Sequence, residues 1–442
     1  MRSERKALAA VPPMGWNSYT CFYIAVREEE VKANARYIAE RLARYGWQYV
    51  VIDGMWYEDT GPIAGETPWE RKPFRLDPHG RLLPESRRFP SAAGEAGLKP
   101  IADYAHRLGL KFGLHIMRGI PRLAVDANCP ILGTPYRARD VADPANLCPW
   151  YDGMVGMKPE HPGSQAYYDS LLAQYAGWGV DYIKADDMET WLGGAVYREW
   201  DVRAVSTAID RCKRPMLLSL SGGLPTDTSF AEHRKTWSEL WRITDDLHDE
   251  WPAVRQTFDA LSRWMPHSGP GHWADPDMLP FGKLHIRESA NAAKTGRRTG
   301  MTRLTRDEQV TVMTLWCISR SPLMFAGDLP GNDDWTLLLI TNPDVLAVNQ
   351  RSSGNRELFR RDDIRVWIAT AEDGRSRYVA CFNLSDAASA TVRLPFAELL
   401  LPDECHVRDL WARQDMGSVT DFFSVETPPH GARLLKIWSD QM

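Results

Sequence analysis

Eight apolar, strand-like runs alternate with segments of helical periodicity along the first three quarters of the chain. The runs cover residues 13–18, 47–53, 111–117, 180–186, 216–221, 240–246, 273–278 and 322–328. In the first helical segment, apolar residues recur from Val31 to Leu42, and Gly46 follows as an expected C-terminal glycine. Strands that alternate with helices form a parallel sheet, and an eightfold repeat favours closure. The sequence therefore predicts an α/β fold built on a (β/α)8 TIM barrel.

The pattern changes after Asn342-Pro343. Short strand-like pieces at residues 364–369, 377–384, 390–394 and 432–438 are separated by Asp, Gly and Ser turns, and helical periodicity is weak. We therefore expect two domains, a catalytic barrel over residues 1–350 and a small antiparallel β domain over residues 351–442. The Pro- and Gly-containing stretch 119–163 is predicted to be a long loop after the third strand, and loops of that length are commonly functional.

Composition excludes several classes of protein. The formal net charge is −5, which argues against a nucleic-acid partner. No apolar run approaches the roughly 18 residues of a membrane span, and we find no signal peptide, so we expect no membrane partner. Seven cysteines form an odd set without a CxxC pair, which predicts neither a disulfide framework nor a zinc site and favours a cytoplasmic location. The chain has 18 tryptophans, and aromatic faces of this kind fill cores or line sugar-binding grooves.

Polar side chains lie at the predicted C-terminal ends of the strands, where TIM barrels carry their chemistry. Several are acids, one is a lysine and one is an arginine, so a cluster of opposite charges is expected at one mouth. The residues are Asp53, His115, Lys184, Asp186, Ser221, Arg242, Asp246 and Asp277.

Carboxylates beside cations and aromatic walls are typical of glycoside hydrolysis, in which one carboxylate attacks and another protonates the leaving oxygen. Lys184 lies two residues before Asp186, so both point to the same side of the strand and the ammonium favours an ionised carboxylate. Asp187 points the opposite way. We therefore predict Asp186 as the nucleophile.

A second chemistry fits the same residue types. Lys184 is a candidate proton-abstracting base if Asp186, Asp246 and Asp277 hold a magnesium ion, as in enolase-type barrels. Arg242 weakens this reading because a cation four residues before Asp246 would compete with the metal. Spacing alone leaves the alternative open.

Seven motifs, in order along the chain, carry a family resemblance. They are PPMGWNSY (12–19), YVVIDGMW (49–56), LKFGLH (110–115), DYIKADD (181–187), WRITDD (241–246), GPGHWADPDM (269–278) and NPDVLAVNQ (342–350). Together they resemble glycoside hydrolase family 27, the α-galactosidase or melibiase family. The resemblance implies a TIM barrel with a C-terminal antiparallel β-sandwich domain, and a retaining exo-α-glycosidase that forms a covalent glycosyl-aspartate.

Carried over by position, the family nucleophile falls on Asp186 and the acid/base on Asp246 rather than on Asp245. The sugar-holding positions fall on Trp16, Asp53, Lys184, Arg242, Asp277 and Met278. Tyr19, Trp56, His115 and Ser221 occupy further motif or strand-end positions, and we include them as substrate-binding candidates. The resemblance implies no metal and no organic cofactor. The expected partner is an oligosaccharide or simple glycoside. Members of the family usually form dimers or larger assemblies, so the resemblance also implies a homo-oligomer.

The chain departs from the family pattern at five places. Gly54 replaces the second of two acids that bind the hydroxyls defining galactose. His115 replaces a tyrosine, Tyr19 a tryptophan, Met188 the cysteine of the active-site disulfide, and residues 219–223 a Cys-Glu-Trp segment. We therefore expect an α-galactosidase first. The alternatives are a glycosidase for β-L-arabinopyranosides, α-N-acetylgalactosaminides or α-1,6-glucosides, and a non-catalytic sugar-binding barrel.

Overall fold

A ring of eight parallel strands forms the centre of the molecule. The computed structural model describes residues 2–58, 74–94, 96–190, 196–222, 227–287 and 298–440. The strands are β1 (Met14–Asn17), β2 (Tyr49–Ile52), β5 (Lys111–Met117), β9 (Tyr182–Asp186), β12 (Leu217–Leu220), β13 (Leu240–Arg242), β14 (Trp273–Asp275) and β17 (Leu323–Phe325). Each lies within one predicted run, so all eight strand predictions are confirmed. The pairing order is β14-β13-β12-β9-β5-β2-β1-β17.

Leu279, just past β14, closes the ring. Its amide donates to the Met324 carbonyl at 2.8 Å, and its carbonyl accepts from the Ala326 amide at 3.0 Å. These bonds join β14 to β17, the two ends of the sheet. The predicted (β/α)8 barrel is therefore confirmed.

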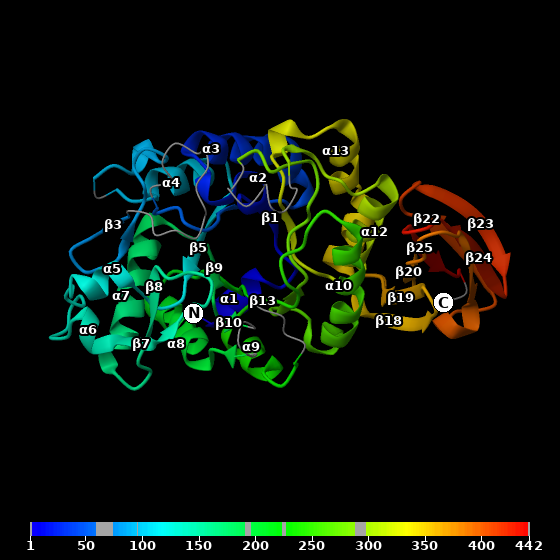
Figure 1. The fold of residues 1–442 in the computed structure, drawn as a ribbon. Coiled ribbons are helices and arrows are strands. Elements are labelled where there is room, and N and C mark those ends of the chain that lie inside the picture. The colour runs from blue at the N-terminus through cyan, green and yellow to red at the C-terminus, as the bar shows by residue number, and fades with distance from the viewer. Residues whose placement is uncertain are drawn as a thin grey trace.

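Helices surround the barrel (Figure 1). The main ones are α3 (Glu28–Tyr37), α4 (Lys99–Arg107), α7 (Pro162–Trp178), α8 (Glu199–Arg211), α9 (Ala231–Trp237), α10 (Trp251–Trp264), α12 (Arg306–Ile318), α13 (Asp334–Thr341) and α14 (Pro343–Arg351). After α3 the chain continues as a π turn and a 3-10 turn and stops at Gly46, whose φ of 99° suits a residue without a Cβ. Thr305 caps α12 by accepting from the Glu308 amide at 3.2 Å.

Shorter elements lie in the connections. The short helices are α2 (Tyr19–Phe22), α5 (Arg122–Asp126) and α6 (Ala138–Val141). The short strands are β3 (Arg75–Leu76), β4 (Leu82–Leu83), β6 (Ile120–Pro121), β7 (Ala142–Leu147), β8 (Met154–Met157), β10 (Glu189–Thr190), β11 (Val196–Tyr197), β15 (Lys283–Leu284) and β16 (Gly300–Met301). β6, β7 and β8 form a small sheet within stretch 119–163, which the sequence presented only as a loop. No described helix has the length and apolar character needed to cross a membrane.

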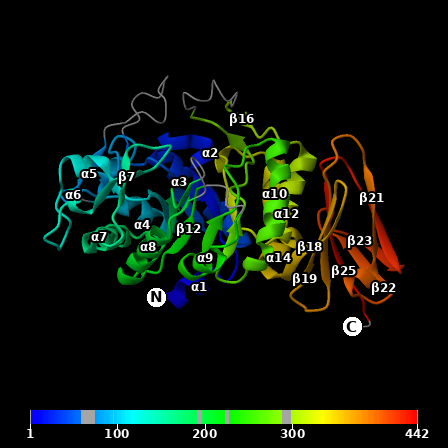
Figure 2. The ribbon, with the colours of Figure 1, turned by 60° about the horizontal axis from the view of Figure 1, so that its bottom comes forward.

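Helix α1 (Arg2–Leu8) covers the end of the barrel where the strands begin (Figure 2). Arg5 is fully buried there, 3.6 Å from the equally buried carboxylate of Glu239, and donates to the Ser206 hydroxyl at 2.8 Å. The Trp273 indole donates to the Ala9 carbonyl at 2.7 Å. The opposite end, where the strands finish, is thus left for the site.

The C-terminal region is an antiparallel β structure, as predicted. One sheet has the order β18-β19-β20-β25-β22-β23, and β21 pairs with β24. The strands are β18 (Ser353–Arg361), β19 (Ile364–Thr370), β20 (Arg377–Asn383), β21 (Ala390–Pro395), β22 (Glu404–Asp409), β23 (Gln414–Thr420), β24 (Phe422–Thr427) and β25 (Ala432–Trp438). A separate apolar core lies between the sheets, and Figure 2 shows them beside α12 and α14. The division of the chain after residue 350 stays a prediction.

Candidate active site

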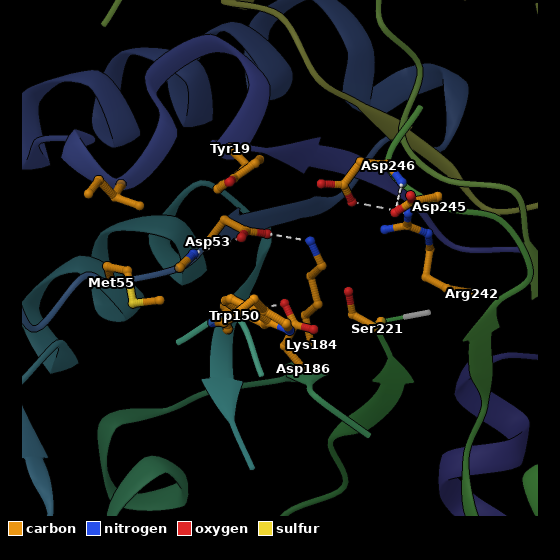
Figure 3. A pocket seen from close by; sticks show the side chains of 14 residues that line it. Tyr19, Asp53, Met55, Trp150, Lys184, Asp186, Ser221, Arg242, Asp245 and Asp246 are labelled. Carbon is orange, nitrogen blue, oxygen red and sulfur yellow. Dashed lines mark hydrogen bonds and ion pairs between the residues drawn. The ribbon is translucent and has the colours of Figure 1, made fainter. Parts of the chain in front are cut away.

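A pocket opens at the C-terminal ends of the barrel strands (Figure 3). It is lined by Tyr19, Ile24, Asp53, Gly54, Met55, His115, Trp150, Lys184, Asp186, Ser221, Gly222, Arg242, Asp245 and Asp246. Eight of the twelve predicted site residues are among them. The barrel brings these side chains together from strands β2, β5, β9, β12 and β13 because parallel strands end at one edge.

The other four predicted residues lie beneath the pocket wall. Trp16 and Trp56 are fully buried, and their indoles donate to the carbonyls of Gly327 and His115, both at 2.8 Å. Asp277 is buried against Arg242, and Met278 packs in the barrel interior. None of the four lines the pocket, but Trp56 and Asp277 contact the lining residues His115 and Arg242.

A buried ion pair forms part of the pocket wall. Lys184 Nζ donates to Asp53 Oδ2 at 2.8 Å, and Asn17 donates to the same oxygen at 2.6 Å. Burial alone would raise the pKa of Asp53, but the charges of Lys184 and His115 and the two hydrogen bonds hold that pKa far below its usual range. Burial would lower the pKa of Lys184, and the Asp53 and Asp277 charges raise it above its usual value. Both groups are therefore charged at neutral pH, which suits them to bind hydroxyls.

Asp186, the last residue of β9, receives two hydrogen bonds. His115 Nε2 lies 3.1 Å from Oδ2, and the Asp187 amide donates to Oδ1 at 2.7 Å. The side chain is only 18% exposed, so burial alone would raise its pKa. The His115 bond and charge, the Lys184 charge and the Asp187 amide outweigh burial and lower the pKa of Asp186. An ionised, mostly buried carboxylate is suited to nucleophilic attack.

Asp246 lies across the pocket from Asp186 in Figure 3. Its side chain is 61% exposed, and Arg242 donates to its Oδ1 at 3.2 Å. The same guanidinium lies 2.9 Å from Asp277 Oδ1, so Arg242 orients Asp246 at the open side of the pocket. Burial raises the pKa of Asp277 to about 6, and the charge of Asp246 adds to this shift while the charge of Arg242 opposes it.

Strained backbone occurs at three of these strand ends. Met55 and Asp187 have φ of 58°, and Asp277 has φ of 93°. Residues with a Cβ rarely adopt such angles, and strain of this kind concentrates at functional sites. The turns after β2, β9 and β14 therefore each contain one strained residue next to the site.

Six lining residues are not among the predicted site residues: Ile24, Gly54, Met55, Trp150, Gly222 and Asp245. Trp150 belongs to stretch 119–163, so loop length was the signal that could have identified it. Ile24 follows β1 in a short turn and carries no comparable signal. Gly223, part of the departure after the fifth strand, lies outside the described residues.

Neither metals nor disulfides are indicated in the described residues. No group of three or more His, Cys, Asp or Glu residues there could hold a metal ion. All seven cysteines are free thiols. Lys184, the base of the enolase-type alternative, is instead bonded to Asp53.

Comparisons with known proteins agree with this geometry. Residues 151–351 match the family model described as alpha galactosidase A, and residues 361–437 match the alpha galactosidase C-terminal beta sandwich domain. Alpha-galactosidase 2 of Arabidopsis thaliana is 26% identical, over 97% of this chain and 89% of that protein. The alpha-N-acetylgalactosaminidase of Rattus norvegicus is 28% identical over 87% and 77%.

Some solved structures are much more similar. One of them is a family 27 β-L-arabinopyranosidase from Geobacillus stearothermophilus, 44% identical, with a TM-score of 0.94 over 99% of this chain and 98% of that one. Identity of this level over both whole chains shows common family membership. The chain therefore belongs to glycoside hydrolase family 27 and is a glycoside hydrolase.

Proposed function

We propose that this enzyme is a retaining exo-glycosidase for pyranosides with the ring configuration of galactose, and that β-L-arabinopyranosides are preferred over α-D-galactosides. The two sugars share the arrangement of their ring hydroxyls. They differ because arabinopyranose lacks the hydroxymethyl group on C5. The choice between them therefore depends on what the pocket offers that group.

Gly54 is the observation that carries the proposal. It lines the pocket next to Asp53, at the position where the family resemblance places a second acid. Met55 and Ile24, which also line the pocket, are apolar. We propose that this part of the wall faces the C5 substituent, because a missing acid beside the shared ring hydroxyls would affect both sugars alike. A hydroxymethyl hydroxyl left unpaired there costs about 1–3 kcal/mol, so a galactoside loses binding that an arabinopyranoside never required.

The relatives favour the arabinopyranoside over the α-galactoside. A solved structure 44% identical belongs to a β-L-arabinopyranosidase and one 41% identical to a putative alpha-N-acetylgalactosaminidase, whereas the curated α-galactosidases are 25–27% identical. α-Galactosides remain the second candidate because Asp53 and Lys184 bind ring hydroxyls that both sugars share.

The mechanism we propose uses the two facing aspartates. Asp186 attacks the anomeric carbon as the bond to the leaving oxygen breaks, and Asp246 gives its proton to that oxygen. A glycosyl ester on Asp186 results. Asp246, now a carboxylate, takes a proton from water, and the hydroxide displaces Asp186 to give the free sugar with retained configuration.

Location and assembly also remain proposals. A cytoplasmic location is supported by the odd number of cysteines and the lack of a CxxC pair. Self-association is supported only by the family resemblance.

A panel of nitrophenyl glycosides tests the function. It should contain the β-L-arabinopyranoside, α-galactoside, α-N-acetylgalactosaminide and α-glucoside. We expect the highest kcat/KM on the arabinopyranoside. The kcat/KM on the α-galactoside should be next and about 10- to 100-fold lower. Preference for the α-glucoside, or no turnover of any member, would contradict the proposal.

Restoring the acid should change the preference between sugars. An ideal Cβ on Gly54 would lie 3.7 Å from His115 Cε1, which is ordinary contact, so the position has room for the Cβ that Gly54→Asp adds. We expect the ratio of kcat/KM for α-galactoside over β-L-arabinopyranoside to rise about tenfold. Gly54→Ala is the control because it adds the Cβ without the carboxylate. An equal rise in both variants would show that volume, not hydrogen bonding, sets the preference.

The His115 hydrogen bond predicts a pH effect. Because His115 lowers the pKa of Asp186, His115→Phe should raise that pKa toward the value that burial favours. The acid limb of kcat/KM should then move to higher pH, since more Asp186 is protonated at a given acidic pH. His106→Phe is the control, because His106 forms a matching 2.7 Å contact with Asp181 near the start of β9. A limb that stays in place in His115→Phe would argue against Asp186 as the titrating nucleophile.

A further inference from the structure

The turn that follows Asp186 is strained. Asp187 has φ of 58°, in the left-handed region that a residue with a Cβ rarely occupies. The amide of this same residue donates to Asp186 Oδ1 at 2.7 Å. The orientation of the Asp186 carboxylate therefore depends on a backbone conformation that asparagine, aspartate and glycine tolerate best.

The side chain of Asp187 points away from the pocket and is fully buried. Arg118, whose side chain is 1% exposed, holds it: Nε donates to Asp187 Oδ2 at 2.8 Å, and Nη2 lies 2.7 Å from the same oxygen. Nε also reaches the Asp187 carbonyl at 3.1 Å. The amide of Arg118 donates to the carbonyl of Asp186 at 3.1 Å. One residue thus bonds to both members of the turn.

Two helices brace this arginine from behind. Its Nη1 lies 4.0 Å from the buried Asp201 of α8, and Asp201 accepts a 2.8 Å bond from the Tyr168 hydroxyl of α7. Tyr168 in turn accepts from the Gly119 amide at 3.0 Å. Burial raises the pKa of Asp187 to about 6, although the charge of Arg118 opposes the shift. Burial alone would lower the pKa of Arg118, but the charges of Asp187 and Asp201 outweigh burial and raise that pKa above its usual value. The charge pair is therefore costly to bury and needs its partners.

We propose that Arg118 and Asp187 are positioning residues for Asp186: their ion pair, buried on the side of β9 away from the pocket, locks the strained turn that keeps the Asp187 amide on the nucleophile. Neither residue touches the substrate pocket. This inference rests on the proposed function because it assumes that Asp186 is the nucleophile.

Arg118→Met tests the proposal. Loss of the clamp lets the turn relax, and misplacement of a nucleophile by about 1 Å costs about 10- to 100-fold, so kcat should fall by that factor while KM stays within about threefold. The matched control is Arg5→Met, which removes an equally buried guanidinium from Glu239 at the other end of the barrel. Both variants are compared below their unfolding transitions, with near-UV circular dichroism verifying the folded fraction. A kcat for Arg118→Met within twofold of that for Arg5→Met would overturn the proposal.

A double variant separates positioning from general damage. In Arg118→Met/Asp187→Gly the orphaned carboxylate is gone, and glycine adopts φ of 58° without strain. We expect kcat to return to within about fivefold of the wild type. A double variant as slow as Arg118→Met would refute the locked-turn explanation. If the wild type itself cleaves no glycoside of the panel, the proposed function fails instead, so the two failures are distinguishable.

Discussion

An ionised carboxylate at a mostly buried position is the constraint on which the site depends. Asp186 is mostly buried, and burial favours its neutral form, so its charge requires compensation. His115 supplies a hydrogen bond from β5, Lys184 a charge from the same strand, and Asp187 an amide from the following turn. Three features of the fold therefore converge on one functional group.

The barrel explains how these contributions arrive together. Parallel strands place their last residues at one edge, and α1 covers the other end with its own buried ion pair. Fully buried tryptophans, among them Trp16 and Trp56, belong to the large apolar core that contains residues of both the strands and the surrounding helices. Trp56 donates to the carbonyl of His115, so core packing fixes the residue that bonds to Asp186.

The sequence predicted the parts of the structure that follow from periodicity and from strand ends. The strand at 111–117 has the predicted bounds because its apolar pattern is complete. Strands such as β23 were missed because they are almost wholly exposed and lack an apolar face. Met55 and Trp150 were missed as pocket residues because a turn and a loop place them in the pocket. Turns and loops have no repeating apolar pattern from which such a position could be predicted. Their placement depends on tertiary contacts that a single sequence does not reveal.

The most direct test of the central claim is to trap the glycosyl ester. In Asp246→Ala, 2,4-dinitrophenyl β-L-arabinopyranoside needs no acid to lose its leaving group, but breakdown of the ester lacks its general base, so the ester should accumulate. Acid quenching and peptide mass mapping should then find one anhydropentose on the peptide that contains Asp186. An adduct on another carboxylate, or release of a sugar with inverted configuration and no adduct, would contradict the account.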